Sequence, residues 1–189
     1  LTVVSKRALN ANLSGLEFAS GIPGSIGGAV TMNAGAYGGE MKDVVSSVKC
    51  INRNGNIIEL TNDEVNFGYR KSTVQDKDLV VVEVTMNLSS GDYDEIHGKM
   101  KDYTERRTSK QPLNLPSGGS TFKRPTGYYA GKLIEDAGLK GLKLGGAQVS
   151  EKHSGFIVNV DHATCDDVRN LIKVVQKVVG DKYQVHLEP

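Results

Sequence analysis

The chain has 189 residues, which suits one or two domains and is enough to bury a core without disulfides or metal ions. Hydrophobic residues make up 38% and charged residues 24%, a composition that excludes intrinsic disorder. Lys and Arg number 23 against 22 Asp and Glu, and this net charge of +1 argues against a broad, non-specific nucleic-acid surface.

The sequence contains no apolar run near the ~18 residues of a membrane-spanning helix and no recognisable signal peptide, so we expect no membrane insertion. The two cysteines, Cys50 and Cys165, show no CxxC spacing, which argues against a disulfide scaffold and a common zinc site. Reduced thiols are typical of the cytoplasm, which is the location we expect.

Glycine dominates residues 21–40, which hold seven glycines. Glycine permits positive φ and close backbone approach, so we expect a shaped loop here, with at most a short helix over 25–32.

The rest of the first half is strand-like. Asn54-Gly55, between the runs 44–51 and 56–61, predicts a hairpin with a type I′ turn. The β-branched run 79–88 predicts a buried strand.

The second half mixes helices, loops and short strands. Helical spacing predicts a helix over 94–108, and Gly138 is the expected stop of another over 127–137. Thr164 and Asp167 form a predicted capping box for a helix with an apolar stripe. The remaining expectations are a Pro/Ser/Gly-rich loop over 111–126, strands over 156–160 and 183–187, and a helix end at Gly180. No regular βαβ rhythm is present, so the sequence favours an α+β fold.

The segment 21–28, GIPGSIGG, has the composition of an anion cradle. Successive backbone N–H groups can converge on an anion only where side chains do not block it, and a helix starting near Ser25 would add a favourable dipole. The spacing is neither that of a P-loop nor that of a dinucleotide-binding turn. The residues alone are compatible with two interpretations, a phosphate-binding loop and a tight structural turn.

Longer blocks carry a resemblance to a known family. They occur in the family's order and cover nearly the whole chain: GLEFASGIPGSIGGAVTMNAGAYGGE, FGYRKS, RRTSKQPLNLPSGGSTFKRP, GYYAGKLIEDAGLKG, SGFIVNV and HLEP. The sequence therefore resembles the UDP-N-acetylenolpyruvoylglucosamine reductases, flavoenzymes of peptidoglycan precursor synthesis. GIPGSIGGA is shared with related flavin oxidases, whereas GGSTFKRP makes the resemblance specific.

The resemblance implies a particular architecture. Members have two FAD-binding lobes of the vanillyl-alcohol-oxidase type and a C-terminal α+β lobe that closes over the sugar nucleotide. This chain resembles the second FAD-binding lobe, over residues 1–104, and the substrate lobe, over 105–189, of the family's shorter branch. The first lobe has no counterpart, so we expect a fragment that binds FAD weakly or not at all and whose site is completed by missing segments.

The chemistry implied by the resemblance has two halves. NADPH reduces FAD, and the reduced flavin then delivers hydride to the enolpyruvyl double bond of UDP-N-acetylglucosamine enolpyruvate, giving UDP-N-acetylmuramate. Ser120 matches the proton donor of the family and Arg70 its catalytic arginine. The third catalytic group, a glutamate, is expected just beyond Pro189, so Glu188 is given no catalytic role.

The resemblance also assigns binding residues. The expected flavin contacts are Gly21, Ile22, Pro23, Gly24, Ser25, Gly27, Gly28 and Asn33, and the expected substrate contacts are Tyr37, Lys110, Arg124 and His153. Several of these residue types also occur without a binding role. A serine can belong to a turn, basic residues can lie on a solvated face, and a histidine can be structural.

Two other functions stay open. One is a different flavin oxidase of the same binding fold, although no histidine that could tether flavin lies near the glycine loop. The other is a non-catalytic phosphate-binding module, which would lack flavin absorbance. Substitution of Ser120 and Arg70 separates both from the reductase. The oligomeric state is left open.

Overall fold

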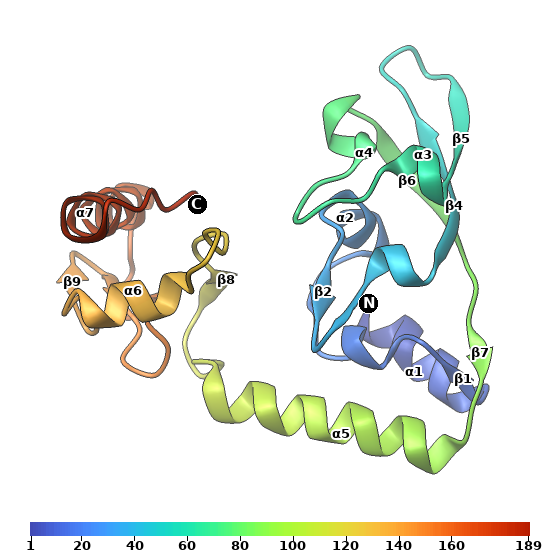
Figure 1. The fold of residues 1–189 in the computed structure, drawn as a ribbon, viewed down its shortest axis with the longest axis horizontal. Helices are drawn as coiled ribbons and strands as arrows, with labels where there is room; N and C mark the ends of the chain where they lie inside the picture. Colours follow the sequence, from blue (N-terminus) through green and yellow to red (C-terminus); the bar gives the residue numbers. More distant parts are fainter. The chain divides into compact units, whose positions relative to one another are not determined.

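The computed structural model describes residues 1–189 and divides into two compact units, Leu1–Arg107 and Thr108–Pro189. Helices and antiparallel strands are mixed in both units, which confirms the predicted α+β class (Figure 1). None of the helices combines the length and apolar character needed to cross a lipid bilayer.

Unit 1 holds short helices around a three-stranded sheet. Its helices are α1 (Thr2–Asn10), η1 (Glu17–Ala19), α2 (Ile26–Thr31), η2 (Met41–Asp43), α3 (Asn62–Val65), α4 (Thr73–Asp76) and α5 (Tyr93–Lys110), which runs past the unit's last residue. Its strands are β1 (Leu13–Ser14), β2 (Gly35–Ala36), β3 (Gly39–Glu40), β4 (Val45–Ile51), β5 (Ile57–Thr61), β6 (Val80–Met86) and β7 (Ser89–Ser90).

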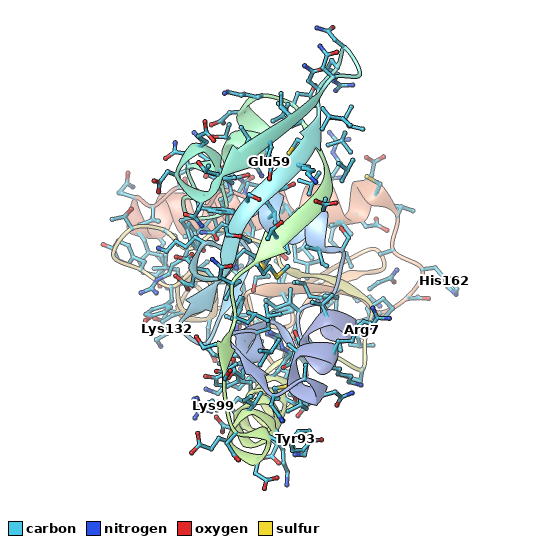
Figure 2. The ribbon with its side chains drawn as sticks, turned by 90° about the vertical axis from the view of Figure 1, so that its right-hand side faces the viewer. Arg7, Glu59, Tyr93, Lys99, Lys132 and His162 are labelled. Atoms are coloured by element: carbon cyan, nitrogen blue, oxygen red, sulfur yellow. The ribbon has the colours of Figure 1, made fainter.

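The sheet has the antiparallel order β5-β4-β6, with Val48 of the central strand fully buried. Glu59 of β5 lies on this sheet and accepts a hydrogen bond of 2.9 Å from the Ser47 hydroxyl (Figure 2). The strand expected over 79–88 is confirmed as β6, but its expected burial is wrong, because Val80 and Val82 are 63% and 52% exposed. β6 is an edge strand that packs against α2, so a run of valines does not by itself imply burial on both faces.

The turn between β4 and β5 differs from the predicted type. Gly55 has φ +81°, but Asn54 does not have the positive φ that a type I′ turn requires. The side-chain oxygen of Asn52 instead accepts from the N–H groups of Asn54 and Asn56, at 2.9 and 3.0 Å. This side-chain cap stabilises a longer loop, so the hairpin is confirmed and its turn type is wrong.

Unit 2 is a four-stranded antiparallel sheet with two helices. Its elements are β8 (Ser117–Ser120), α6 (Ala130–Asp136), β9 (Lys143–Leu144), β10 (Ala147–Val149), β11 (Phe156–Asn159) and α7 (Cys165–Tyr183), with the strand order β8-β11-β10-β9. The segment 111–126 is therefore not all loop, because β8 pairs with β11. The Ser-Gly-Gly-Ser sequence of β8 lacks the alternation of apolar and polar residues that would predict a strand.

Helix α7 begins as its sequence predicts. The Thr164 hydroxyl accepts from the Asp167 N–H at 3.1 Å, and the Asp167 carboxylate accepts from the Thr164 N–H at 2.9 Å. Leu171, Val175 and Val179 of the predicted stripe are fully buried. Each such side chain contributes roughly 1.5–3 kcal/mol to the free energy of unfolding.

The end of α7 corrects two expectations. The helix passes through Gly180 and stops at Gln184, whose φ is +57°, because a glycine ends a helix only when it adopts the left-handed conformation itself. The predicted strand over 183–187 is absent. Leu187 is instead fully buried in the core, with its carbonyl accepting a 2.8 Å hydrogen bond from the Gln176 amide.

Candidate functional site

The glycine loop leads directly into α2. Ser25 caps the helix, and its hydroxyl accepts from the Gly28 N–H at 3.1 Å, which confirms the helix start expected near Ser25. Gly24 has φ +110°, a conformation that a side chain would strain. The first N–H groups of the helix are left without helical acceptors.

The residues around this loop fit an anionic cofactor. The Ser20 hydroxyl is buried and has no hydrogen-bond partner, although buried hydroxyls are usually paired. A Cβ added to Gly21 would lie 2.7 Å from Nε of Arg107, so the guanidinium is held directly against the loop backbone. An unpaired hydroxyl, an arginine and a helix N-terminus together suit a phosphate-bearing ligand.

Tyr37 lies at the turn between β2 and β3, with φ +53°. Its ring stacks on Tyr103 of α5, with centroids 4.5 Å apart and planes 7° apart. The guanidinium of Arg107 lies 5.9 Å from the centroid of the Tyr37 ring. Tyr103 and Arg107 were not among the expected contacts, although their four-residue spacing on a helix places them on one face.

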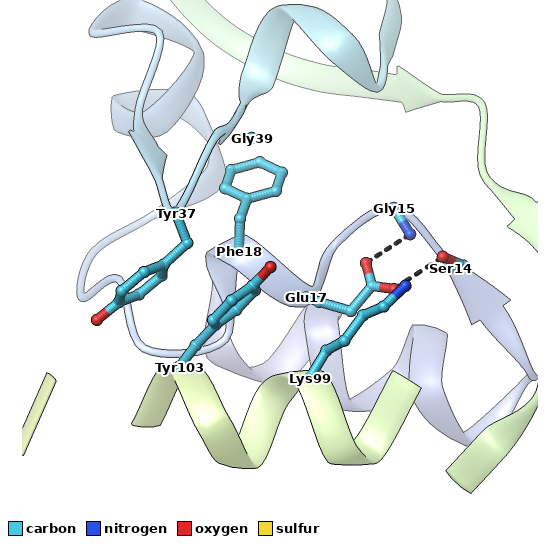
Figure 3. A pocket seen from close by; sticks show the side chains of 8 residues that line it. All are labelled: Ser14, Gly15, Glu17, Phe18, Tyr37, Gly39, Lys99 and Tyr103. Carbon is cyan, nitrogen blue, oxygen red and sulfur yellow. Dashed lines mark hydrogen bonds between the residues drawn. The ribbon is translucent and has the colours of Figure 1, made fainter. Parts of the chain in front are cut away.

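A hollow of about 220 Å³ adjoins Tyr37 (Figure 3). Its lining residues are Ser14, Gly15, Glu17, Phe18, Tyr37, Gly39, Lys99 and Tyr103. The buried Glu17 carboxylate accepts 2.7 Å hydrogen bonds from the Ser14 hydroxyl and the Gly15 N–H. Burial alone would raise the pKa of Glu17, but these hydrogen bonds, one from its own backbone and the charge of Lys99 together outweigh it, and the pKa lies below its ordinary value. The hollow is therefore lined by the Glu17 carboxylate and by the Lys99 side chain of opposite charge.

Arg70 belongs to a tight turn in unit 1. The turn is closed by hydrogen bonds from Gly68 N–H to the Lys71 carbonyl, 2.9 Å, and from Lys71 N–H to the Gly68 carbonyl, 3.3 Å. Arg70 has φ +55°, an uncommon conformation for a long side chain. Its guanidinium lies 5.5 Å from the centroid of the Tyr69 ring, and the residue is half-buried.

Asn33 connects this turn to the end of α2. The residue is 2% exposed, and its side-chain N–H groups donate to Glu40 Oε2 at 2.8 Å and to the Gly68 carbonyl at 3.1 Å. Its carbonyl accepts from the Lys42 N–H at 3.0 Å. A second link joins the same elements, because the buried Ser72 hydroxyl donates to the Thr31 carbonyl at 2.8 Å. Unit 1 thus brings the glycine loop, Asn33 and the Arg70 turn onto one short helix.

Ser120 ends β8 in unit 2, opposite Phe156 of β11, and is exposed. Gly119 has φ +92°, and a Cβ at Gly118 or Gly119 would meet no atom within 4 Å. The next residue, Thr121, is fixed by a 2.8 Å hydrogen bond from its N–H to the Gly155 carbonyl. The Ser120 hydroxyl therefore lies at the end of a strand that is fixed by hydrogen bonds, and the space beside the two preceding glycines is open.

His153 lies in the turn between β10 and β11. Its Nδ1 accepts from the Gly155 N–H at 3.0 Å, which assigns the proton of the neutral ring to Nε2. The ring meets Phe156 edge-on with centroids 5.0 Å apart, and this phenylalanine pairs with Ser120 across the sheet. The neighbouring Ser154 hydroxyl is buried without a partner. His153 thus has a structural bond on one nitrogen and a donor left on the other.

The basic residues of unit 2 are engaged in different ways. The Arg124 guanidinium lies 4.0 Å from the centroid of the Tyr129 ring. Lys123 forms an ion pair with Glu188 and also donates its backbone N–H to the Glu188 carbonyl at 2.7 Å, so its charge is compensated within the unit. Lys110 is exposed at the last residue of α5.

Comparisons with known proteins give consistent matches. A family model for the C-terminal domain of UDP-N-acetylenolpyruvoylglucosamine reductase matches residues 111–189, and one for an FAD binding domain matches residues 2–61. The UDP-N-acetylenolpyruvoylglucosamine reductase of Caldanaerobacter subterraneus subsp. tengcongensis is 57% identical over the whole chain, which covers 63% of that protein. The reductase of Limosilactobacillus reuteri is 60% identical over 97% of the chain and 62% of that protein.

A solved structure agrees with these sequence matches. The crystal structure of UDP-N-acetylenolpyruvylglucosamine reductase from Thermus caldophilus matches with a TM-score of 0.87 and 36% identity, over 98% of this chain and 66% of that one. The chain thus spans about two thirds or less of the length of these proteins.

Proposed function

We infer that this chain belongs to the UDP-N-acetylenolpyruvoylglucosamine reductase family. The protein is accordingly an FAD-dependent oxidoreductase of cell-wall precursor synthesis. It reduces UDP-N-acetylglucosamine enolpyruvate to UDP-N-acetylmuramate and uses NADPH as hydride donor. The reaction is assigned to the cytoplasm, and both cysteines are free, as a reducing compartment requires. The FAD-binding lobe comprises residues 1–104, which also contribute Tyr37 and Arg70 to the substrate, and the substrate lobe comprises residues 105–189. The two compact units, which divide at Arg107 and Thr108, support this division.

The glycine loop holds the cofactor. Its expected contacts are the residues of the Gly21–Gly28 segment, where Gly24 borders open space and the glycines carry no side chain that would keep an anion from the backbone. When bound, FAD supplies the hydride chemistry of the reaction. The single observation that supports this role most strongly is the buried Ser20 hydroxyl, which has no hydrogen-bond partner and directly precedes Gly21, the residue that the Arg107 side chain contacts.

Ser120 donates the proton. Reduction of a carbon–carbon double bond adds hydride to one carbon and a proton to its neighbour, and the serine hydroxyl carries a proton at neutral pH. Solvent then restores the proton to the serine oxygen. The open approach at Gly118 and Gly119 leaves room for a substrate beside the hydroxyl. A positioned acid contributes about 10²–10⁴-fold in rate.

Arg70 binds the substrate carboxylate. Negative charge grows on that side of the substrate as hydride arrives, and a planar guanidinium can hold it bidentately. The substrate contacts proposed for Tyr37, Lys110, Arg124 and His153 complete the assignment. His153 retains a ring N–H for this purpose, since only Nδ1 is used in the turn.

The test measures NADPH oxidation by the intact protein with the enolpyruvyl sugar nucleotide. Ser120→Ala is expected to lower kcat by about 10²–10⁴-fold. Ser117→Ala is the matched control, because Ser117 is an exposed serine at the other end of the same strand, opposite Val158. Equal rates in the two variants, or no oxidation that depends on the nucleotide, would overturn the proposal.

A further inference from the structure

We propose that Asn33 is a positioning residue that fixes the Arg70 turn on the end of α2, and that it is not a flavin ligand. The inference rests on the proposed function in that it takes Arg70 as the group that meets the substrate. It concerns what holds this arginine, a role that no motif in the sequence assigns.

The hydrogen-bonding groups of the Asn33 side chain are used within the protein. A side-chain amide offers two N–H donors and one carbonyl. Both donors are used, one on the Glu40 carboxylate at 2.8 Å and one on the Gly68 carbonyl at 3.1 Å. The carbonyl accepts from Lys42 N–H at 3.0 Å, and the residue is 2% exposed. Asn33 therefore has no donor left for a cofactor.

The Arg70 turn needs support from residues outside the turn. An arginine at φ +55° is held in a conformation that persists only where the surroundings determine it. Asn33 binds the residue that opens the turn, and Ser72, just after the turn, binds the Thr31 carbonyl at 2.8 Å. These bonds span 35 and 41 residues of sequence, so they act as anchors rather than as part of the turn.

The two anchoring bonds lie at the end of α2 that is farther from the glycine loop. Ser25 begins α2 beside the glycine loop, whereas Thr31 and Asn33 lie at its other end. A helix of six residues is about 9 Å long at 1.5 Å per residue, and it acts as a rigid spacer. The anchors thus set the distance between the glycine loop and Arg70. A misplacement of about 1 Å at a reacting group can cost about 10²-fold in rate.

The test uses Asn33→Gly in the intact protein. Asn33 has φ +41°, which glycine adopts without strain, so the substitution removes the side-chain bonds and keeps the backbone. Amide hydrogen exchange at Gly68 and Lys71 is expected to accelerate at least about tenfold, because local opening becomes easier. The value of kcat is expected to fall about 10–100-fold, with flavin content and KM within about twofold.

Two further variants make the test specific. Asn62→Ala removes an amide that donates to the Lys42 and Val45 carbonyls, at 2.9 and 2.6 Å, and it leaves the turn untouched. It is expected to change neither kcat nor exchange at Gly68. Should Asn33→Gly fail to fold, Asn33→Ser is the second variant, because its single hydroxyl donor cannot replace both amide donors, and the same measurements apply.

The outcomes separate this inference from the proposed function. The double variant Arg70→Ala/Asn33→Gly is expected to have a kcat within about twofold of that of Arg70→Ala alone, because the two residues act as a unit. Unchanged exchange at Gly68 and Lys71 overturns the inference, as does a loss of flavin affinity with full kcat in the loaded fraction. An Arg70→Ala variant with unchanged kcat overturns the catalytic role of Arg70, whereas the exchange result still decides whether Asn33 anchors the turn.

Discussion

Ser72→Ala removes one hydroxyl from the interior of unit 1. Ser72 is fully buried, and its hydroxyl donates to the Thr31 carbonyl, the last carbonyl of α2, at 2.8 Å. No backbone N–H donates to that carbonyl. The substitution therefore leaves the last carbonyl of α2, on the half-buried Thr31, without its donor beside a fully buried side chain.

The expected cost follows from these contacts. The net contribution of an ordinary hydrogen bond is about 0.5–1.5 kcal/mol, whereas leaving a buried acceptor unpaired costs about 1–3 kcal/mol. The hydrogen bond is part-buried, with Ser72 0% exposed and Thr31 half-buried, so we expect a cost in the middle of the second range. With a urea slope of about 2 kcal/mol/M, a loss of about 2 kcal/mol lowers the unfolding midpoint by about 1 M.

The assay is urea unfolding followed by circular dichroism, with amide hydrogen exchange to assign the loss to unit 1. Ser46→Ala is the matched control, because the Ser46 hydroxyl makes the same kind of bond, to the Thr85 carbonyl at 3.1 Å, in an exposed position. We expect less than about 0.5 kcal/mol for the control, since water replaces the lost partner. Equal losses in the two variants would refute the reasoning from burial.

Three further predictions concern other parts of the chain. Gly146→Ala places a Cβ 2.0 Å from the backbone oxygen of Asp161, so unit 2 should lose more than about 3 kcal/mol of stability; a thermal midpoint close to that of the wild type would contradict this packing. Leu171→Ala empties a fully buried position in the core of unit 2 and should cost about 2–5 kcal/mol by urea unfolding, so a loss below about 1 kcal/mol would contradict the observed burial. Glu17→Gln should be less stable than the wild type at pH 7. The pKa of Glu17 is lowered on folding, so the stability from its charge is present above the ordinary carboxyl pKa and lost as the pH falls through the folded value. Denaturation curves between pH 7 and 3 should therefore converge, and a gap that stays constant with pH would contradict the assignment.

Local features of the fold could be predicted from the sequence. The Ser25 cap of α2 and the Thr164 capping box of α7 each depend on bonds within three residues, so the sequence contains the whole signal. The apolar stripe of α7 was predictable for the same reason, since helical period alone places Leu171 and Val175 on one face.

Features that depend on distant partners could not be predicted in this way. Leu187 is buried only because the core that it shares with α6 and α7 is present. The segment 183–187 taken by itself has the pattern of a strand. β8 is a strand only because β11 supplies its hydrogen bonds. Edge position, which exposes Val80, is likewise a property of the assembled sheet.

The candidate site shows the same division. The spacing of the glycines indicated the loop, and the resemblance indicated Arg70 and Ser120. Sequence reasoning missed Arg107 against Gly21, because α5 and the loop meet only in the folded unit. It also gave no sign that Asn33 binds Gly68, 35 residues away.

The most direct test of the proposed reaction is anaerobic mixing of the intact protein, after reduction of its flavin by NADPH, with the enolpyruvyl sugar nucleotide in a stopped-flow absorbance experiment. We predict that the oxidised flavin bands return with one equivalent of UDP-N-acetylmuramate formed, and that Ser120→Ala slows this phase by about 10²-fold or more. Flavin that stays reduced after the nucleotide is added would contradict the proposed activity.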